Sequence, residues 1–172
     1  MNTLFLSLGS NRGDRMDMLK QAAGLIGNRV GAVEALSPVY ETEPWGFEDE
    51  ISFYNCVLKV RTGLSPEAVL LSIIGIERSL GRDRGAESAS DVGERTYHSR
   101  TIDIDILFYN DLILESAGLI IPHPGITNRR FVLAPLNDVC PDFVHPVERK
   151  TVRELLAACR DFSEVSRILD ML

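Results

Sequence analysis

The sequence has few of the residues that mark secreted, zinc-binding or membrane proteins. Its three cysteines are an odd number and lack a CxxC spacing, so neither a disulfide framework nor a zinc site is expected. No apolar run approaches the roughly 20 residues that a membrane-spanning helix needs. No basic segment precedes the short apolar stretch at the start, which argues against a signal peptide. We therefore expect a cytoplasmic protein without a membrane partner.

Lysine is also scarce, and the chain is acidic. Only three of the 18 basic residues are lysines, and the formal net charge is −7. An acidic chain is poorly suited to bind nucleic acid, so no such partner is expected. Genome composition could explain the excess of arginine, and so could recognition of phosphate groups, which suits the planar guanidinium. The length of 172 residues and the 45% of hydrophobic residues fit one domain spanning 1–172.

The spacing of apolar residues predicts a mixture of strands and helices. Strands are predicted at 3–8, 31–41, 53–62, 101–109, 112–114 and 119–121. Helices are predicted at 14–27, 65–80, 127–134 (halted near Pro135) and 151–159, with another short helix in the last ten residues. The order β-α-β-β-α-β predicts an α+β fold, a ferredoxin-like sandwich with helices packed on an antiparallel-rich sheet. Loops are predicted at 42–50 and 82–99.

Two carboxylates lie in the clearest of these strands, 101–109. The period of two places Asp103 and Asp105 on one face, about 7 Å apart, while the isoleucines around them face the core. Two acids so close repel each other unless a cation lies between them. Magnesium prefers oxygen ligands and leaves coordination positions for substrate phosphates. The pair therefore indicates either a magnesium site or a solvated strand face that happens to carry two acids.

Arginines are frequent on both sides of this strand. Six candidates lie in the segments before it or after the PHPG turn: Arg82, Arg84, Arg95, Arg100, Arg129 and Arg130. Such a group could share with magnesium the neutralisation of a polyphosphate, although any one of them could instead form a surface ion pair. The sequence lacks a GxxxxGK[ST] loop, which excludes phosphate binding of that type. His123, between two prolines, is a candidate phosphate donor or proton shuttle, or a structural histidine.

A second candidate site combines two phenylalanines and an asparagine. Phe53 and Asn55 share one strand face by the period of two. An asparagine amide offers donors and an acceptor that match the edge of an amino-oxo pyrimidine ring. Phe53 and Phe131 could hold such a ring between them, or both could be core residues beside a half-buried asparagine.

Five segments together resemble the 6-hydroxymethyl-7,8-dihydropterin pyrophosphokinase family of folate biosynthesis. They are SLGSNRGD at 7–14, SPVYETEPWG at 37–46, FYN at 53–55, RTIDIDIL at 100–107 and IPHPGITNRRFVLAPL at 121–136. The resemblance covers roughly residues 3–150. It implies a ferredoxin-like fold and transfer of the β,γ-diphosphate of ATP to the hydroxymethyl oxygen of the pterin, with release of AMP.

The resemblance also implies roles for individual residues. Asp103 and Asp105 match the pair that holds two Mg²⁺ ions, and the catalytic set adds Arg82 and Arg100. The positions implied for the pterin are Thr42, Glu43, Trp45, Phe53, Asn55 and Phe131, with the two phenylalanines as the stacking pair. Those implied for the co-substrate ATP are Glu77, Arg82, Arg84, Tyr97, Arg100, Ile106, His123 and Arg129. Tyr97 stands where the family often has tryptophan.

Two other functions are compatible with the same residues. An acidic magnesium-dependent phosphohydrolase or nuclease could use the same aspartate pair. A ferredoxin-like binding module without activity is the second alternative, although the acidic composition and the missing aromatic RNA-binding pattern disfavour an RNA-binding module. The expected partners are therefore small molecules, ATP and the hydroxymethyl pterin. A monomer is expected, with a weak dimer as the alternative.

Overall fold

The computed structural model of the chain describes residues 1–43, 51–82, 101–170 and 172. Within these residues, six strands form one sheet in which each neighbouring pair is antiparallel. In spatial order the strands are β5 (Asp103–Tyr109), β1 (Asn2–Ser10), β4 (Phe53–Thr62), β3 (Val39–Thr42) and β8 (Val165–Leu169), and β2 (Ala32–Leu36) also pairs with β4. This order confirms the predicted ferredoxin-like α+β arrangement.

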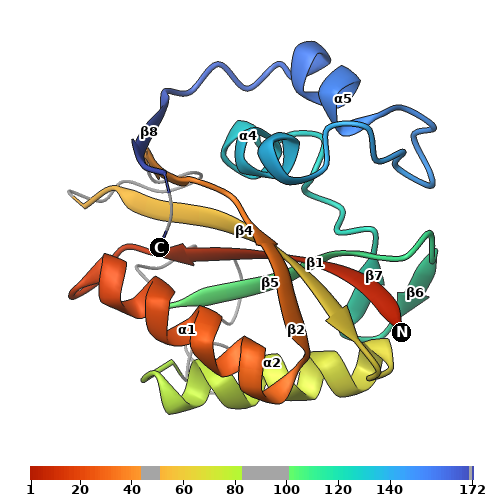
Figure 1. Cartoon of the computed structure of the whole chain (residues 1–172). Helices are drawn as coiled ribbons and strands as arrows, with labels where there is room; N and C mark the ends of the chain where they lie inside the picture. Colours follow the sequence, from red (N-terminus) through yellow and green to blue (C-terminus); the bar gives the residue numbers. More distant parts are fainter. Residues whose placement is uncertain (44–50, 83–100, 171) are drawn as a thin grey trace.

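Helices cover both faces of the sheet, so the fold has three layers (Figure 1). One face packs against α1 (Arg15–Arg29) and α2 (Pro66–Ser79), and the other lies below α4 (Arg130–Val139) and α5 (Val152–Ala158). A separate hairpin joins β6 (Leu114–Ser116) to β7 (Leu119–Ile121). None of the helices in the described ranges has the length and apolar character needed to cross a membrane.

The face toward α1 and α2 carries the main hydrophobic core. Alternate residues of β1, Leu4, Leu6 and Leu8, are fully or almost fully buried there. Ile104 and Ile106 of β5 pack into the same core, as the period of two predicts. Both helices begin at side-chain caps, because Asp14 accepts a hydrogen bond from the backbone of α1 and Ser65 accepts one from α2.

The opposite face carries a smaller, aromatic core at one end only. The rings of Phe5 and Phe108 lie 6.1 Å apart in an edge-to-face arrangement, and Phe143 lies 4.7 Å from Phe108. An irregularity in the β1–β5 register allows both Leu107 and Phe108 to join this core, under α4 and α5. Toward the other end of β1 the apolar side chains stop, and that end of the face is left to polar residues.

Four predicted elements differ from the structure, the last of them only slightly. The strand predicted at 31–41 is divided into β2 and β3, because Pro38 has no N–H for the ladder. At this break Ser37 keeps contact with β4: its N–H donates to the Val57 carbonyl at 2.9 Å and its hydroxyl accepts from the Val57 N–H at 2.8 Å. The helix predicted at 127–134 begins later and passes through Pro135 to Val139. Burial of its apolar side chains outweighs the backbone bond that proline removes.

The third difference concerns the last ten residues, which were predicted to form a short helix. Residues Val165–Leu169 instead form β8, an edge strand that pairs with β3. The backbone groups of β3 are satisfied on its outer side by this pairing, which a local sequence pattern does not reveal. The short strand predicted at 112–114 lies slightly later, at β6.

Candidate active site

The polar end of the sheet brings the two predicted sites onto one surface. Strand β1 runs between β5 and β4, and Gly9 lies opposite Asp103 on one side and opposite Asn55 on the other. Neighbouring strands are about 4.8 Å apart, so the backbones of Asp103 and Asn55 lie roughly 10 Å from each other. Because directly opposed residues share a face, the acids of β5 and the amide of β4 project to the same side.

Gly9 places no side chain on the sheet surface between Asn55 and Asp103. A Cβ atom added to Gly9 would lie 2.8 Å from Oδ1 of Asn55 and 3.7 Å from Cδ1 of Phe53. The first distance is shorter than van der Waals contact, so any side chain at this position would displace the asparagine amide. The absence of a side chain at Gly9 therefore leaves room above β1 for a ligand that reaches from Asn55 to Asp103.

The amide of Asn55 is held in one orientation. Asn55 is 7% exposed, and its Nδ2 donates a hydrogen bond of 2.7 Å to Oγ1 of Thr42, which is itself buried. Thr42 ends β3, and Glu43 follows it with an exposed side chain. Phe53, at the start of β4, lies beside Gly9 on the same face.

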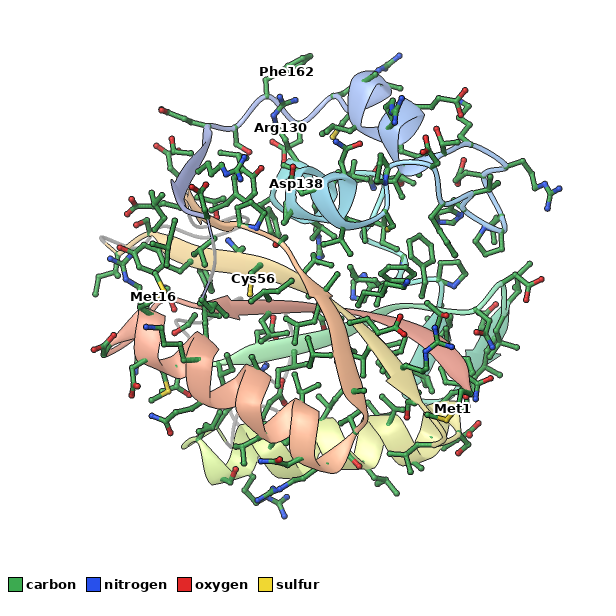
Figure 2. All side chains as sticks on the ribbon, in the orientation of Figure 1. Met1, Met16, Cys56, Arg130, Asp138 and Phe162 are labelled. Carbon is green, nitrogen blue, oxygen red and sulfur yellow. The ribbon has the colours of Figure 1, made fainter. Side chains whose placement is uncertain are left out.

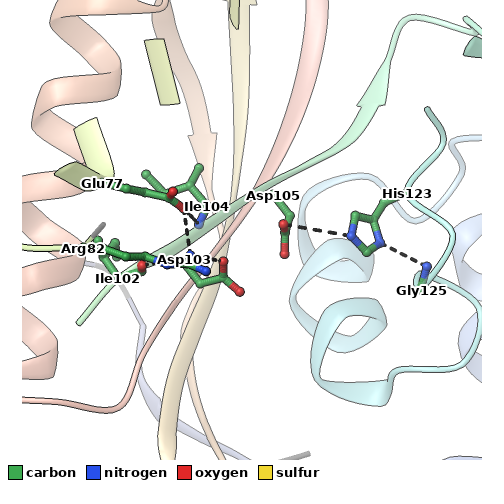
Figure 3. A network of polar contacts seen from close by, with 8 residues as sticks. All are labelled: Glu77, Arg82, Ile102, Asp103, Ile104, Asp105, His123 and Gly125. Atoms are coloured by element: carbon green, nitrogen blue, oxygen red, sulfur yellow. Dashed lines mark hydrogen bonds and ion pairs between the residues drawn. The ribbon is translucent and has the colours of Figure 1, made fainter. Parts of the chain in front are cut away.

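The first acid of the pair belongs to a buried ionic network (Figure 3). Nη1 of Arg82 donates to Oδ1 of Asp103 at 2.5 Å and to Oε1 of Glu77 at 3.0 Å. Glu77 is fully buried and also accepts a hydrogen bond of 2.8 Å from the Ile104 N–H. The guanidinium thus provides the positive charge beside Asp103, and Glu77 compensates that charge where solvent is excluded.

The second acid faces His123, which is held from two sides. The His123 N–H donates to the Leu107 carbonyl at 3.0 Å, and its Nδ1 accepts from the Gly125 N–H at 3.0 Å. This leaves Nε2 pointing toward Oδ1 of Asp105, 4.0 Å away (Figure 3). The pKa of His123 is lowered to about 4, mainly by burial and in addition by the charge of Arg129, with Asp103 opposing both. The ring is therefore neutral near pH 7 and carries its proton on Nε2.

The first turn of α4 supplies Arg129 and Phe131. The guanidinium of Arg129 lies against Gly125, where an added Cβ would meet Cζ at 2.7 Å. Phe131 is partly buried and packs against the aromatic core. Helix α4 packs over β4 and β3, the strands that carry Asn55 and Thr42.

Comparison with known proteins decides between the candidate families. Residues 5–141 match the model of the 7,8-dihydro-6-hydroxymethylpterin-pyrophosphokinase (HPPK) family. The chain belongs to the HPPK family. It is 43% identical over 147 residues to a 2-amino-4-hydroxy-6-hydroxymethyldihydropteridine pyrophosphokinase of Porphyromonas gingivalis, covering 85% of this chain and 95% of the relative. The corresponding protein of Aquifex aeolicus is 37% identical over 154 residues, 90% of each chain.

Solved HPPK structures share the fold. An HPPK-DHPS structure from Plasmodium falciparum superposes with a TM-score of 0.70 at 23% identity over 92% of this chain. This chain spans only 43% of that longer protein. At this identity the likeness establishes the HPPK fold alone.

Apart from Glu43, Glu77, Phe131 and Arg130, the predicted site residues of this HPPK chain fall into three groups. Those that the structure brings to the polar face or its edge are Asp103, Asp105, Arg82, His123, Arg129, Thr42, Phe53 and Asn55. Ile106 packs in the main core on the opposite face, so only its backbone is available to a nucleotide. Trp45, Arg84, Arg95, Tyr97 and Arg100 lie outside the described residues.

Two residues that support the candidate site of this HPPK chain, Gly9 and Arg15, were not predicted from the sequence. The strand predicted at 3–8 ends before Gly9, whereas β1 continues to Ser10. Arg15 is a second such residue: its Nη1 donates to the carbonyl and hydroxyl of Ser52, and its guanidinium lies 3.8 Å from the centre of the Tyr54 ring. These contacts fix the residues just before Phe53. The spacing of SNRGD from FYN in the sequence carried no signal of that contact.

The donor set fits magnesium. Among the described residues no three His, Cys, Asp or Glu side chains converge on one point. Mg²⁺ is usually coordinated by one or two protein carboxylates together with substrate phosphates and water, and two carboxylates on one strand face fit this pattern. An all-protein cage is not needed for a cation that arrives with a nucleotide.

Proposed function

We propose that this HPPK chain transfers the β,γ-diphosphate of ATP to the hydroxymethyl oxygen of 6-hydroxymethyl-7,8-dihydropterin. The observation that supports this most strongly is the register across β1, in which Gly9 lies between Asp103 and Asn55. A phosphate-handling group and a heterocycle-reading group are thereby fixed roughly 10 Å apart on one surface. That is the arrangement required by a reaction between a nucleotide and a second small molecule.

The pterin occupies the Asn55 side of this surface. The Asn55 amide hydrogen-bonds the amino-oxo edge of the ring, and its bond to Thr42 sets its orientation. Phe53 and Phe131 stack on the two faces of the ring, and the backbone groups of Glu43 and Trp45 bind its edge. The hydroxymethyl group then points across Gly9 toward β5.

ATP occupies the β5 side. Arg82, His123 and Arg129 bind its phosphates together with Arg84 and Arg100, and Glu77 and Tyr97 complete the nucleotide side. Asp103 and Asp105 would hold two Mg²⁺ ions, which would supply positive charge beside the phosphates. Arg82 donates to Asp103 in this structure, so the guanidinium releases that carboxylate and moves to the phosphates when ATP binds.

The transfer itself needs little beyond alignment and charge compensation. The pterin hydroxyl gives its proton to the carboxylate of Asp103 or Asp105 and its oxygen attacks the β-phosphorus in line; the bond between the α,β-bridging oxygen and the β-phosphorus breaks, and AMP leaves with that oxygen. The residues of the chain contribute by fixing the two reactants in line and by placing cationic groups around the phosphates.

A phosphorus NMR experiment tests this function. The protein is incubated with ATP, Mg²⁺ and the hydroxymethyl dihydropterin, and the expected products are AMP and a diphosphate ester of the pterin. Asp105→Asn serves as the inactive control. Release of inorganic phosphate or ADP alone, independent of the pterin, would refute the proposal in favour of a phosphohydrolase.

We also propose that the protein acts as a monomer in the cytoplasm. All proposed site residues come from one chain, so no second copy is needed to complete the site, and ATP is made and used in the cytoplasm. Light scattering at several protein concentrations tests the first point, since a mass twice that of 19.1 kDa would contradict it. Fractionation of cells tests the second.

A further inference from the structure

Residues 160–169, called the strap here, contact both α4 and β3, the elements that carry Phe131 and Thr42 of the proposed pterin site. The strap follows α5, whose Val152 and Leu155 are buried in the aromatic core. It passes over the start of α4 and then becomes β8 at the edge of the sheet (Figure 1). The strap lies beyond residue 141, where the match to the family model ends.

The first contact of the strap is with the N-terminus of α4. The N-cap residue of this helix, Arg129, makes no side-chain capping bond, and the first turn holds no acidic residue. Asp161 supplies both from outside the helix, because its Oδ2 accepts the Arg130 N–H at 2.9 Å. A carboxylate at this end of a helix satisfies an otherwise unpaired donor and interacts favourably with the helix dipole.

The carboxylate of Asp161 is itself fixed. Its Oδ1 accepts hydrogen bonds from the Ser163 hydroxyl at 2.6 Å and the Ser163 N–H at 3.0 Å. Partial burial opposes ionisation, but the bonds from Ser163 and Arg130 outweigh it, and the pKa of Asp161 lies below its ordinary value. Phe162, the next residue, is 85% exposed and points away from the body of the protein (Figure 2). The segment is therefore held here by Asp161 and not by apolar burial of its neighbour.

The second contact of the strap is with β3. Val165 pairs with Thr42, the residue that orients the Asn55 amide. Helix α4 is tied to the same strand near its other end, where the Tyr40 hydroxyl donates to Oδ2 of Asp138 at 2.5 Å. Helix α4 is thus linked to β3 by Asp138 directly and by Asp161 through the strap.

We propose that Asp161 is a positioning residue for the pterin: by holding the first turn of α4, it fixes the Phe131 side chain in the position in which it stacks on the pterin ring. The inference rests on the proposed pterin role of Phe131. Arg129 has a second support, since its guanidinium packs against Gly125. Phe131 takes its position from the first turn and from its packing on the aromatic core, and the first of these depends on Asp161. ATP is also bound by groups outside α4, so we expect loss of Asp161 to affect the pterin more than ATP.

The test compares Asp161→Ala, Asp161→Asn and the control Asp142→Ala, which removes an exposed aspartate paired with Arg153. Steady-state kinetics give KM for each substrate and kcat, and calorimetry gives Tm. We expect Asp161→Ala to raise KM for the pterin by roughly fivefold, with KM for ATP changed less than about twofold. Asp161→Asn keeps an acceptor oxygen and is expected to lie between wild type and Asp161→Ala. The control is expected to match wild type.

A double-mutant cycle with Phe131→Ala separates positioning from a general structural role. If Asp161 acts through Phe131, Asp161→Ala adds no further rise in KM for the pterin in the Phe131→Ala background. Independent, multiplicative effects, or a lower Tm with unchanged KM, would overturn the proposal. So would a Phe131→Ala variant with normal pterin affinity, and diphosphate transfer by the wild type would still stand in that case. If Asp161→Ala fails to fold, the same cycle is run with Asp161→Asn.

Discussion

The two faces of the sheet are made by the same strands, yet they serve different purposes. Toward α1 and α2, β1 presents Leu4, Leu6 and Leu8, and the core is continuous. On the other face β1 presents Phe5 at one end and Gly9 at the other, so the apolar packing covers only half of it. An uninterrupted core on one side allows the other side to carry charged groups that contribute little to folding. Substitutions should therefore affect stability on the first face and chemistry on the second.

The largest difference between the effect on activity and the effect on stability is expected at Asp103. Asp103→Asn should lower kcat by roughly a thousandfold, because a carboxylate that holds the cation and the transferring phosphates is lost. The folded state should be little affected, since Arg82 keeps its bonds to Glu77 and to the Ile102 carbonyl. Release of AMP measures the first effect and calorimetry the second, with exposed Asp111→Asn as the matched control. Near-normal turnover at saturating Mg²⁺ would contradict the assignment.

The reverse pattern is expected on the opposite face, at Leu6. Leu6→Ala removes a fully buried side chain from the main core and should destabilise the protein by about 2–5 kcal/mol. Urea unfolding measures this loss. At a temperature where the variant is folded, kcat and both KM values should remain close to wild type. A selective change in KM for the pterin would show that the two faces are not independent.

Gly9 sharpens the comparison, because it lies on the strand that both faces share. Gly9→Ala places a Cβ 2.8 Å from Oδ1 of Asn55, so the amide must rotate away from Thr42. We expect KM for the pterin to rise by roughly tenfold while KM for ATP stays nearly constant. Gly24→Ala in α1 is the control, since nothing lies within 4 Å of the added atom. An equal rise in both KM values would argue against Gly9 as the floor of the pterin side.

The smallest expected effect concerns the pH dependence of the aromatic end, where the His145 ring lies 5.3 Å from Phe108. Nδ1 of His145 accepts hydrogen bonds from the backbones of Val147 and Glu148, and burial lowers the pKa below its ordinary 6.5, with Glu148 opposing the shift. The folded state therefore binds the proton less readily than the unfolded state, so this contribution to stability is full above about pH 6.5 and declines as the pH falls.

Thermal melting between pH 7.5 and pH 5 measures that decline. The Tm of wild type should fall more steeply than that of His145→Gln, which has no titrating ring. His123 is present in both proteins, so its own titration cancels in the comparison. Parallel curves for the two proteins would contradict the assignment to His145.

Much of the fold follows from local pattern, and the exceptions have physical causes. The alternation of isoleucine and aspartate in β5 predicted both the core and the acid pair, because the period of two is intrinsic to a strand. Pro135 predicted a helix end from a local rule, but three buried side chains of α4, Val132, Leu133 and Leu136, override it. Strand β8 depends on a partner more than 100 residues away, which no local pattern encodes.

The site was predictable in its chemistry and less so in its support. The period of two placed Asp103 and Asp105 on one strand face, and the register across β1 puts Asn55 on the same side; their binding roles are part of the proposed function. The supporting residues are ordinary ones: Gly9 resembles a turn glycine, and Asp161 resembles any surface acid. Their importance arises from contacts across the fold, such as the bond between Asp161 and the Arg130 N–H, and these exist only once the chain is folded.

The position of β1 between β5 and β4 has a consequence for how this enzyme can diversify. The ladder hydrogen bonds on either side of β1 set the distance between the proposed ATP side and the proposed pterin side, so this distance does not depend on side-chain identity. Substitutions can change which ligand each side binds. Inserting a single residue into β1 would instead move the side chains beyond the insertion to the opposite face of the sheet. Evolution can therefore change which ligands each side binds, but not the distance between the two sides.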